Sequence, residues 1–418
     1  MQITLSFGES QKFELQLPDD KIVALCDGAG PTLESIPTAV ETALTNPPQF
    51  PGLAEATVPD DLIAFAIGRH IPAVGEIVAA ILEVASRPEL ADRRIAIVLP
   101  HDAGDALQQG VKQLVGDGER VVCEVHDPDD RNKLAFIGAS KENRPIMINR
   151  ILSDADMVIP VGLARLDSSL DYFGPYEAVF PTFTDRETMQ RLSAPTFVEQ
   201  PVLRKRRAGE ATEVGHVLGV LFGLQVEANG PQTIQAIRAG AIDVLAAQIQ
   251  DDLAKSWRYQ PSKRAALAIV AISGGREQQT WANFARALAV GSAATDDNGA
   301  ILICCELATH PSSTMLQLAE HDDLDEQRRR IRRERTADAA AALQLATTLD
   351  RNKVYLLSAL PEGIVDELNM APVANLDEAR KVCEYYESCT FIAHGQLAEV
   401  AVEGEEISSD IDWDQYAL

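Results

Sequence analysis

The sequence predicts an α/β fold with two domains, each built around a largely parallel sheet. Short apolar segments alternate along the chain with segments of helical periodicity, and this order is typical of βαβ units whose strands are covered on both faces. The length of 418 residues exceeds what one hydrophobic core usually supports, which favours two domains.

The first domain should open with a β-hairpin, because two short alternating runs, Ile3–Phe7 and Lys12–Leu17, are separated by polar residues. Apolar strands and amphipathic helices then alternate. The expected strands are Ile22–Cys26, Leu62–Ile67, Ile95–Leu99, Val121–Val125 and Met157–Val161, and the expected helices are Ile36–Leu44, Val74–Ala85 and Ala106–Leu114. A long helix is also expected from Pro231 to Trp257.

The polar segment RYQPSKRA, which contains Pro261, interrupts this pattern and marks the predicted domain boundary. We therefore expect an N-terminal domain over residues 1–260 and a smaller C-terminal α/β domain over residues 265–418. The expected elements of the second domain are strands Ala266–Ile272, Ala300–Cys305 and Val354–Leu357 and helices Trp281–Ala294 and Leu376–Tyr386.

The composition is typical of a soluble globular protein, with 46% hydrophobic and 24% charged residues. The net charge of −26 argues against binding to nucleic acid or an anionic membrane face, because both need a basic surface. It leaves room for a small anionic substrate, which responds to local charge. The chain lacks long apolar runs and a signal-like N-terminus, so we expect a cytoplasmic protein. The six cysteines lack metal-ligand spacing and should be reduced and mostly buried.

The segment Met157–Thr188 is the first candidate for a functional loop. A strand apolar enough for burial on both faces ends in a glycine and opens into a loop of aromatic and acidic residues. In open α/β sheets, ligands bind just beyond the carboxyl ends of such strands. Function should therefore be sought in this loop.

Arg69 and His101 occupy equivalent positions, each just after a predicted strand and before a helix. A guanidinium there can hold a carboxylate or phosphate, and an imidazole can act as a general base near neutral pH. The alternatives are a surface arginine and a histidine that caps the next helix together with Asp102. His70 is expected to point elsewhere, and His126 to lie in a surface loop.

Ser273, Gly274 and Gly275 follow another predicted strand. Two glycines let a ligand approach the backbone, although a tight turn explains them equally well. The segment matches neither GxGxxG, a P-loop nor a GxSxG elbow, which weakens the nucleotide-hydrolase and α/β-hydrolase interpretations. The histidines also lack HExxH or similar spacing, so no protein-only metal site is predicted.

Several segments resemble the nickel-pincer lactate racemase family. They include IAFAIGRHIPAVGEIVAAIL, IVLPHDAGDALQQGVKQLVG, the segment from HDPDDRN to MVIPVGL, AISGG and NKVYLLSALPEG. The resemblance spans nearly the whole chain and implies a cleft between the two domains. Members of the family interconvert the two configurations of a 2-hydroxy acid by moving a hydride to and from a nickel-pincer nucleotide cofactor.

The resemblance also implies roles for individual residues. Arg69 matches the arginine of the anionic site, although the aspartate expected three positions earlier is Ala66. His101 matches a catalytic histidine that exchanges the hydroxyl proton. Asp167 stands where the second catalytic histidine is expected, and its ordinary pKa of about 3.9 suits reversible exchange at neutral pH less well.

The implied cofactor site departs further from the family pattern. Gly174, Tyr176 and Glu177 fall in the segment that is Gly-Gly-Arg-Lys in the family, so Glu177 replaces the lysine that tethers the cofactor. A carboxylate cannot form that covalent link. Gly274 and Gly275 are expected to contribute to the same site. The nickel-ligand histidine falls near Thr212, with His216 as an alternative, and the Gln and Lys after the double glycine fall near Thr280 and Asn283.

Three hypotheses about function remain open on this basis. The first is a divergent isomerase that racemises or epimerises a small 2-hydroxy acid, with the cofactor held noncovalently. The second is an acid/base enzyme without nickel that uses His101 with Asp167 or Glu177. The third is a noncatalytic relative that binds a ligand, because fold alone does not fix activity.

Overall fold

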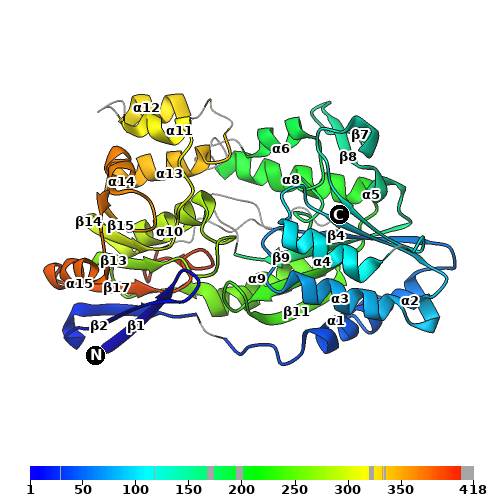
Figure 1. Cartoon of the computed structure of the whole chain (residues 1–418), viewed down its shortest axis with the longest axis horizontal. Coiled ribbons are helices and arrows are strands. Elements are labelled where there is room, and N and C mark those ends of the chain that lie inside the picture. Colours follow the sequence, from blue (N-terminus) through cyan, green and yellow to red (C-terminus); the bar gives the residue numbers. More distant parts are fainter. Residues whose placement is uncertain are drawn as a thin grey trace.

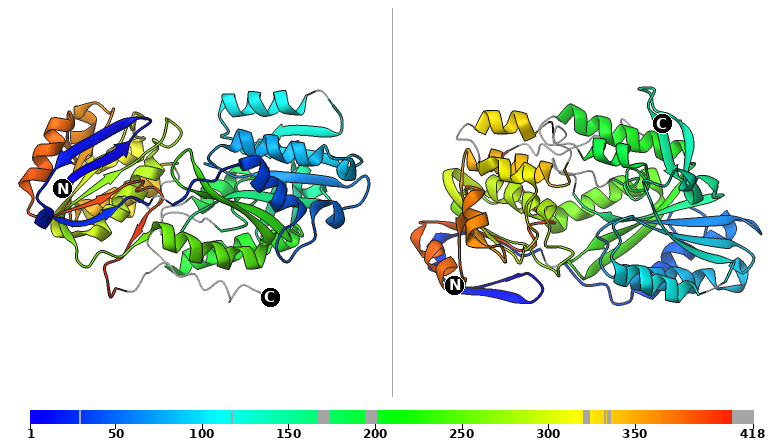
Figure 2. Two further views of the ribbon diagram at one scale, coloured as in Figure 1. Left: turned by 90° about the horizontal axis from the view of Figure 1, so that it is seen from below. Right: turned by 45° about the horizontal axis from the view of Figure 1, so that its top comes forward.

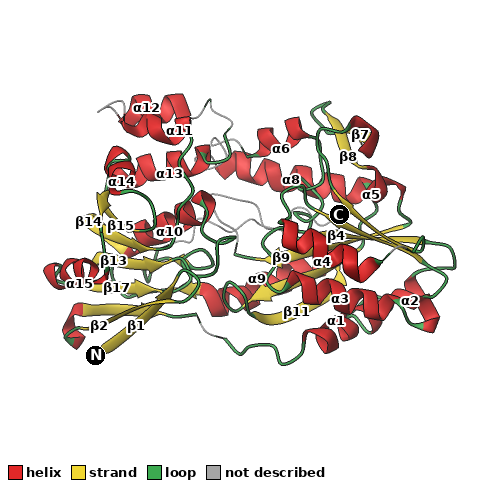
Figure 3. Cartoon of the chain, viewed as in Figure 1, coloured by secondary structure: helices red, strands yellow, loops and turns green. Residues whose placement is uncertain are grey.

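The computed structural model describes residues 1–28, 30–116, 118–166, 174–193, 201–319, 324–331, 333 and 336–405. Within these residues, two α/β units lie side by side, and each contains a six-stranded sheet (Figure 1). Two further views show the units as separate lobes connected by few segments (Figure 2). The predicted fold class, two α/β units with largely parallel sheets, is confirmed (Figure 3).

The first unit has the strand order β11-β10-β9-β4-β5-β6, in which only β11 runs antiparallel to its neighbour. Its strands are β4 (Leu62–Ile67), β5 (Arg94–Leu99), β6 (Val121–Val125), β9 (Met157–Ala164), β10 (Phe222–Ala228) and β11 (Ile234–Ala241). Its α-helices are α1 (Ile36–Thr45), α2 (Leu53–Ala56), α3 (Val74–Ala85), α4 (Asp105–Val115), α5 (Arg150–Asp154), α6 (Arg186–Leu192), α8 (Pro201–Val217) and α9 (Ile242–Trp257). A separate hairpin joins β7 (Leu134–Ala139) to β8 (Pro145–Asn149).

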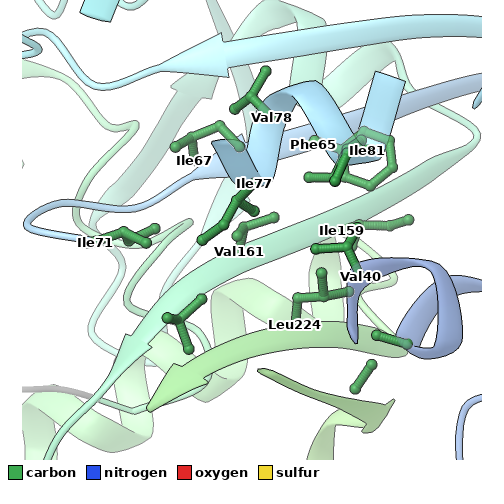
Figure 4. Packing of buried hydrophobic residues seen from close by; sticks show 14 of the residues in the cluster. Val40, Phe65, Ile67, Ile71, Ile77, Val78, Ile81, Ile159, Val161 and Leu224 are labelled. Carbon is green, nitrogen blue, oxygen red and sulfur yellow. The ribbon is translucent and has the colours of Figure 1, made fainter. Parts of the chain in front are cut away.

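Both faces of this sheet are covered, which explains the continuous apolar character of its strands. Phe65 and Ile67 face a cluster shared with α1 and α3, whereas Ala64 faces a second cluster that includes residues of α8. Figure 4 shows Phe65 and Ile67 packed with Ile77 and Ile81 of α3. Burial of each large apolar side chain contributes about 1.5–3 kcal/mol, so the strand ends are held on a rigid platform.

The second unit has the strand order β16-β15-β14-β13-β17-β3, and all neighbouring pairs are parallel. Its strands are β3 (Ile22–Cys26), β13 (Ala265–Ala271), β14 (Thr295–Cys304), β15 (Lys353–Leu357), β16 (Ala371–Pro372) and β17 (Cys389–Ile392). Its α-helices are α10 (Trp281–Ala294), α11 (Ser313–Leu316), α12 (Leu324–Ile331), α13 (Ala339–Leu349), α14 (Glu362–Glu367) and α15 (Leu376–Tyr385). Two residues each of β12 (Arg258–Tyr259) and β18 (Glu399–Val400) pair nearby.

The N-terminal hairpin belongs to this second unit. Strands β1 (Gln2–Phe7) and β2 (Gln11–Gln16) form the predicted antiparallel pair, and their buried residues, including Phe13, join the core of the second sheet. Strand β3 pairs with β17 at the edge of that sheet. The prediction placed residues 1–260 in the first domain, but β1, β2 and β3 pack with the second sheet. Local sequence does not specify which sheet an edge strand joins.

The predicted helix from Pro231 to Trp257 needs a second correction. Its first part forms β11, which pairs antiparallel with β10, and only Ile242–Trp257 is helical. In β11, four consecutive residues from Gln235 to Arg238 are only partly buried, so the strand lacks the clear two-residue alternation that identifies a strand in sequence. Pairing with β10 overrides its helix-like composition.

Each sheet has one point where the order of connection reverses. In the first sheet it lies between β4 and β9, and in the second between β13 and β17. Crevices open beyond the carboxyl ends of parallel strands at such points, which makes them the expected ligand sites. Within the described residues, no helix is both long and apolar enough to cross a bilayer.

Candidate functional site

A cleft of about 530 Å³ opens beyond the carboxyl ends of β4 and β5. Arg69, His70 and Asp102 line it from the first unit, and Glu277 and Gln278 line it from the loop that follows β13 in the second unit. The cleft predicted between the two units is therefore present.

Arg69 and His101 come together as predicted, because their parallel strands are neighbours. Nη2 of Arg69 lies 3.3 Å from Nδ1 of His101, and Nε of Arg69 lies 3.2 Å from Oδ2 of Asp102. The side chains of Arg69 and His101 are 26% and 23% exposed, so both are mostly covered but still accessible from solvent.

Arg186 completes this cluster from a distant part of the chain. It is the first residue of α6, whose start is fixed by Asp185, because that carboxylate accepts a 2.8 Å hydrogen bond from the Thr188 backbone N–H. Nη1 of Arg186 lies 3.4 Å from Nε2 of His101, and its Nη2 lies 2.8 Å from Oδ2 of Asp129. Both ring nitrogens of His101 therefore face a guanidinium.

This arrangement determines the charge state of His101. Desolvation lowers its pKa, Arg69 and Arg186 lower it further, and Asp102 and Asp129 act in the opposite direction. A neutral imidazole offers one acceptor nitrogen, whereas guanidinium groups only donate. One ring nitrogen can accept from one arginine, and the second arginine then faces a ring N–H. A bound carboxylate would accept hydrogen bonds from the guanidinium N–H groups that do not donate to His101.

His70 lines the cleft, contrary to the expectation that it points elsewhere. Its backbone lies in the left-handed region, with φ of 58°. Desolvation within the cleft lowers its pKa to about 4, and the cationic side chains of Arg165 and Arg286 are the next causes. Arg286 belongs to α10 of the second unit. Several arginines thus surround His70, although the whole chain carries a net charge of −26.

His126 is buried, which corrects the prediction of a surface loop. It is 2% exposed, its Nε2 lies 2.8 Å from the Thr184 carbonyl oxygen, and its Nδ1 lies 3.3 Å from Nδ2 of Asn149. These contacts fit a neutral ring that donates from Nε2 and accepts at Nδ1, and desolvation lowers its pKa to about 4. His126 ties the end of β6 to the loop before α6 and does not line the cleft.

The segment that contains Gly174, Tyr176 and Glu177 lies near the end of β4, because a Cβ at Gly68 would lie 3.2 Å from Cβ of Ala178. Tyr176 is 2% exposed in the core of the first unit, and its hydroxyl donates to Oδ1 of Asp243 at 3.1 Å. Glu177 is partly buried, and its Oε1 accepts from Oγ1 of Thr182 at 3.2 Å. Gly174 is buried beside them. Their contact with a cofactor stays a prediction, and Asp167 lies outside the described residues.

Gly274 and Gly275 lie in the wall between the units. The Gly274 N–H donates to the Gly8 carbonyl oxygen at 2.7 Å, and a Cβ at this position would meet Cβ of Pro231 at 2.5 Å. Its φ of 103° also favours glycine. Gly275 precedes Glu277 and Gln278, which reach the cleft. Their role in holding a cofactor likewise stays a prediction.

Of the two expected nickel-ligand positions, Thr212 offers only a hydroxyl, whereas His216 is an exposed imidazole. The Thr212 hydroxyl donates to the Ala208 carbonyl oxygen within α8 at 3.1 Å. His216 packs edge-on against Tyr176, with ring centroids 6.0 Å apart. Within the described part of the chain, no group of three or more His, Cys, Asp or Glu residues could hold a metal ion.

Sequence reasoning missed two residues of this site, Arg186 and His70. Arg186 lies in the loop segment that the sequence singled out. Asp185 within TDRETM, with Glu187 just after it, is a helix-start pattern that could have placed Arg186 at a helix N-terminus. Nothing in the sequence indicates its contact with His101, which is 85 residues away. The left-handed backbone of His70 has no clear sequence signal.

Comparisons with known proteins agree with this architecture. Residues 7–200 match the sequence family described as "Lactate racemase N-terminal domain". The lactate racemase apoprotein from Thermoanaerobacterium thermosaccharolyticum has a similar structure, with a TM-score of 0.80 and 20% identity over 96% of this chain and 100% of that one. A protein from Thermotoga maritima is similar with a TM-score of 0.61 and 13% identity, over 90% of this chain and 100% of that one. The search of curated proteins found no match. The resemblance predicted from the sequence segments is thus confirmed.

Proposed function

Because residues 7–200 match the lactate racemase N-terminal domain family, we propose that this protein is an isomerase of small 2-hydroxy acids. The observation that carries the proposal is the neutral His101 ring held between the guanidinium groups of Arg69 and Arg186. Such a site is suited to an anion that carries a hydroxyl group close to its negative charge.

The described residues support distinct roles in this proposal. Arg69 and Arg186 bind the substrate carboxylate, because guanidinium groups match a carboxylate in geometry and charge. His101 is placed to accept the proton of the hydroxyl on C2 and to return it. The configuration would change only if a hydride acceptor, held noncovalently, took the C2 hydrogen with its electron pair and gave it back. The cationic surroundings keep His101 neutral and therefore able to accept that proton.

The anchoring positions do not fit the tethered nickel cofactor of the family. Glu177 cannot form the covalent link, and its Oε1 is already engaged by the Thr182 hydroxyl. Thr212 uses its hydroxyl within its own helix. We therefore derive no step through that cofactor from these residues.

The residue at position 177 favours a second candidate, an acid/base enzyme on this scaffold that works without nickel. In this case a base removes the C2 proton and an acid returns a proton to the opposite face. Glu177 supplies a carboxylate where the family has an amine, which is the observation that favours this candidate.

Deuterium exchange at C2 separates the two candidates. Each enantiomer of lactate and of longer 2-hydroxy acids is incubated with the protein in D₂O, and products are analysed by chiral chromatography and proton NMR. Conversion with retention of the C2 hydrogen supports hydride movement, whereas conversion with deuterium at C2 supports proton abstraction. A protein that converts none of these acids contradicts the proposal. Binding without conversion would identify a noncatalytic relative.

The pH dependence of kcat/KM provides a further prediction. His101 must be neutral to accept the hydroxyl proton, and its pKa is lowered from the ordinary value of 6.5. Activity should therefore remain constant as the pH falls through 6.5 and should decline only below it. Arg186→Gln removes one of the cations that lower this pKa, so its acidic limb should shift toward higher pH. An unshifted limb in that variant contradicts the assignment of His101 as the base.

A further inference from the structure

Ser273 and His394 meet at the reversal point of the second sheet. Ser273 lies two residues beyond β13 and His394 two residues beyond β17, and these parallel strands are neighbours. The Ser273 hydroxyl is hydrogen-bonded to Nδ1 of His394. A hydroxyl nucleophile and an imidazole thus lie together where an α/β sheet most often places a ligand site.

A cavity of about 430 Å³ opens onto this pair. Ser273 and His394 line it together with the turn of the N-terminal hairpin and the loop between β10 and β11. Pro231 and Gln232 border both this cavity and the Arg69 cleft. Because Pro231 also packs against Gly274, these segments form a border that the two cavities share.

The surrounding contacts hold both side chains in place. The Ser273 carbonyl oxygen accepts a 2.7 Å hydrogen bond from Nε2 of Gln396, and the edge of the His394 ring packs against Trp257 with centroids 5.9 Å apart. His394 itself has a positive φ of 52°, a conformation that non-glycine residues rarely adopt and that is frequent at functional sites. A fixed ring that can accept at Nδ1 is what activates a serine.

The charge state of His394 supports the same role. Desolvation lowers its pKa, and the carboxylate of Asp27 acts in the opposite direction. Asp27 directly follows β3, the strand beside β17, so serine, histidine and aspartate follow three adjacent strands. The ring is neutral at neutral pH and is able to take the serine proton.

We propose that Ser273 and His394 form a second catalytic site that hydrolyses small polar acyl esters. Oγ of Ser273 attacks the acyl carbon while its proton passes to Nδ1 of His394. The ester C–O bond then breaks, and the leaving alkoxide takes that proton. Water next gives a proton to Nδ1 and attacks the acyl-serine, and the released Oγ recovers the proton. Glu9, Lys12 and Gln232 line the cavity and offer polar contacts to a short polar substrate.

The test uses the full chain with a fluorophosphonate probe and with p-nitrophenyl acetate. Intact-mass and peptide analysis should show one adduct of each reagent, located on Ser273. Ser273→Ala and His394→Gln should each slow labelling and nitrophenol release by at least about 100-fold. Ser86→Ala and His310→Gln, whose side chains line neither this cavity nor the Arg69 cleft, should both react at the wild-type rate.

Several results would overturn the proposal. They are labelling that maps to another residue, wild-type labelling in Ser273→Ala, and no labelling of the folded wild-type protein. The peptide assignment in wild-type protein does not depend on how any variant folds. Isomerase activity is assayed with 2-hydroxy acids and esterase activity by labelling of Ser273, so failure of one proposal is distinguishable from failure of the other.

Discussion

His101→Gln should lower kcat/KM for isomerisation of a 2-hydroxy acid by about 10²–10⁴-fold, because it removes the only group placed to exchange the hydroxyl proton among the described residues of the cluster. Glutamine keeps a polar side chain between Arg69 and Arg186, so the carboxylate should still bind. Chiral chromatography measures turnover, and calorimetry with each enantiomer measures affinity. We expect a large loss of turnover with a dissociation constant within about threefold of wild type.

His310→Gln is the matched control, because His310 is exposed and its Nδ1 contacts only the neighbouring Pro311 carbonyl oxygen among the bonds of the described residues. This variant should keep wild-type turnover. Arg186→Gln should raise KM more than it lowers kcat, because Arg186 binds the carboxylate that is present in both ground and transition states. A His101→Gln protein with full turnover would exclude His101 as the base.

Arg238→Met should reduce the free energy of unfolding by about 3 kcal/mol at neutral pH, because it leaves a buried carboxylate without its cation. Glu227 is fully buried in β10, and its Oε1 lies 2.5 Å from Nε of Arg238. Arg238 also reaches Oδ2 of Asp252 at 2.7 Å. This loss of stability lies at the low end of the range for removing one partner of a buried ion pair, because the Arg238 side chain is 42% exposed.

The double variant Glu227→Gln with Arg238→Met should recover most of the loss, because no buried charge then remains. The pH dependence follows from desolvation, which raises the pKa of Glu227 in the folded protein. Without Arg238 this pKa rises further, so Glu227 takes up a proton as the pH falls and the cost of Arg238→Met becomes smaller. Urea unfolding at pH 7 and pH 5 measures both effects.

Arg351→Met provides the control for a surface ion pair. Arg351 and Asp297 are 51% and 76% exposed, so this substitution should change stability by less than about 1 kcal/mol. If Arg238→Met also lowers the free energy of unfolding by less than about 1 kcal/mol at both pH values, the Glu227 carboxylate does not depend on its arginine partner.

Much of the fold could be predicted because burial on both faces leaves a clear sequence pattern. Strand Leu62–Ile67 and helix Val74–Ala85 have the predicted bounds, since each packs against a core whose periodicity the sequence records. Strand β11 was missed because its partly exposed residues do not alternate clearly. The placement of β3 was missed because an edge strand finds its sheet through distant residues.

The site was predictable to the extent that it depends on strand ends. Arg69 and His101 could be brought together because consecutive parallel strands place their following loops at one edge of the sheet. Arg186 and the Ser273–His394 pair could not be predicted, because their contacts join residues 85 and 121 positions apart. Such contacts depend on the packing of whole units, and local periodicity carries no record of them.

The position of β3 has a consequence for the order of events during protein synthesis. Its residues leave the ribosome long before those of β17, its neighbour in the sheet, which spans Cys389–Ile392. The hairpin and β3 must therefore wait, with an unpaired edge, while the first unit is made and can fold. Contacts of such sequence separation slow folding. We expect the nascent chain to be most prone to aggregation in this interval, and a chaperone that covers β3 would protect it.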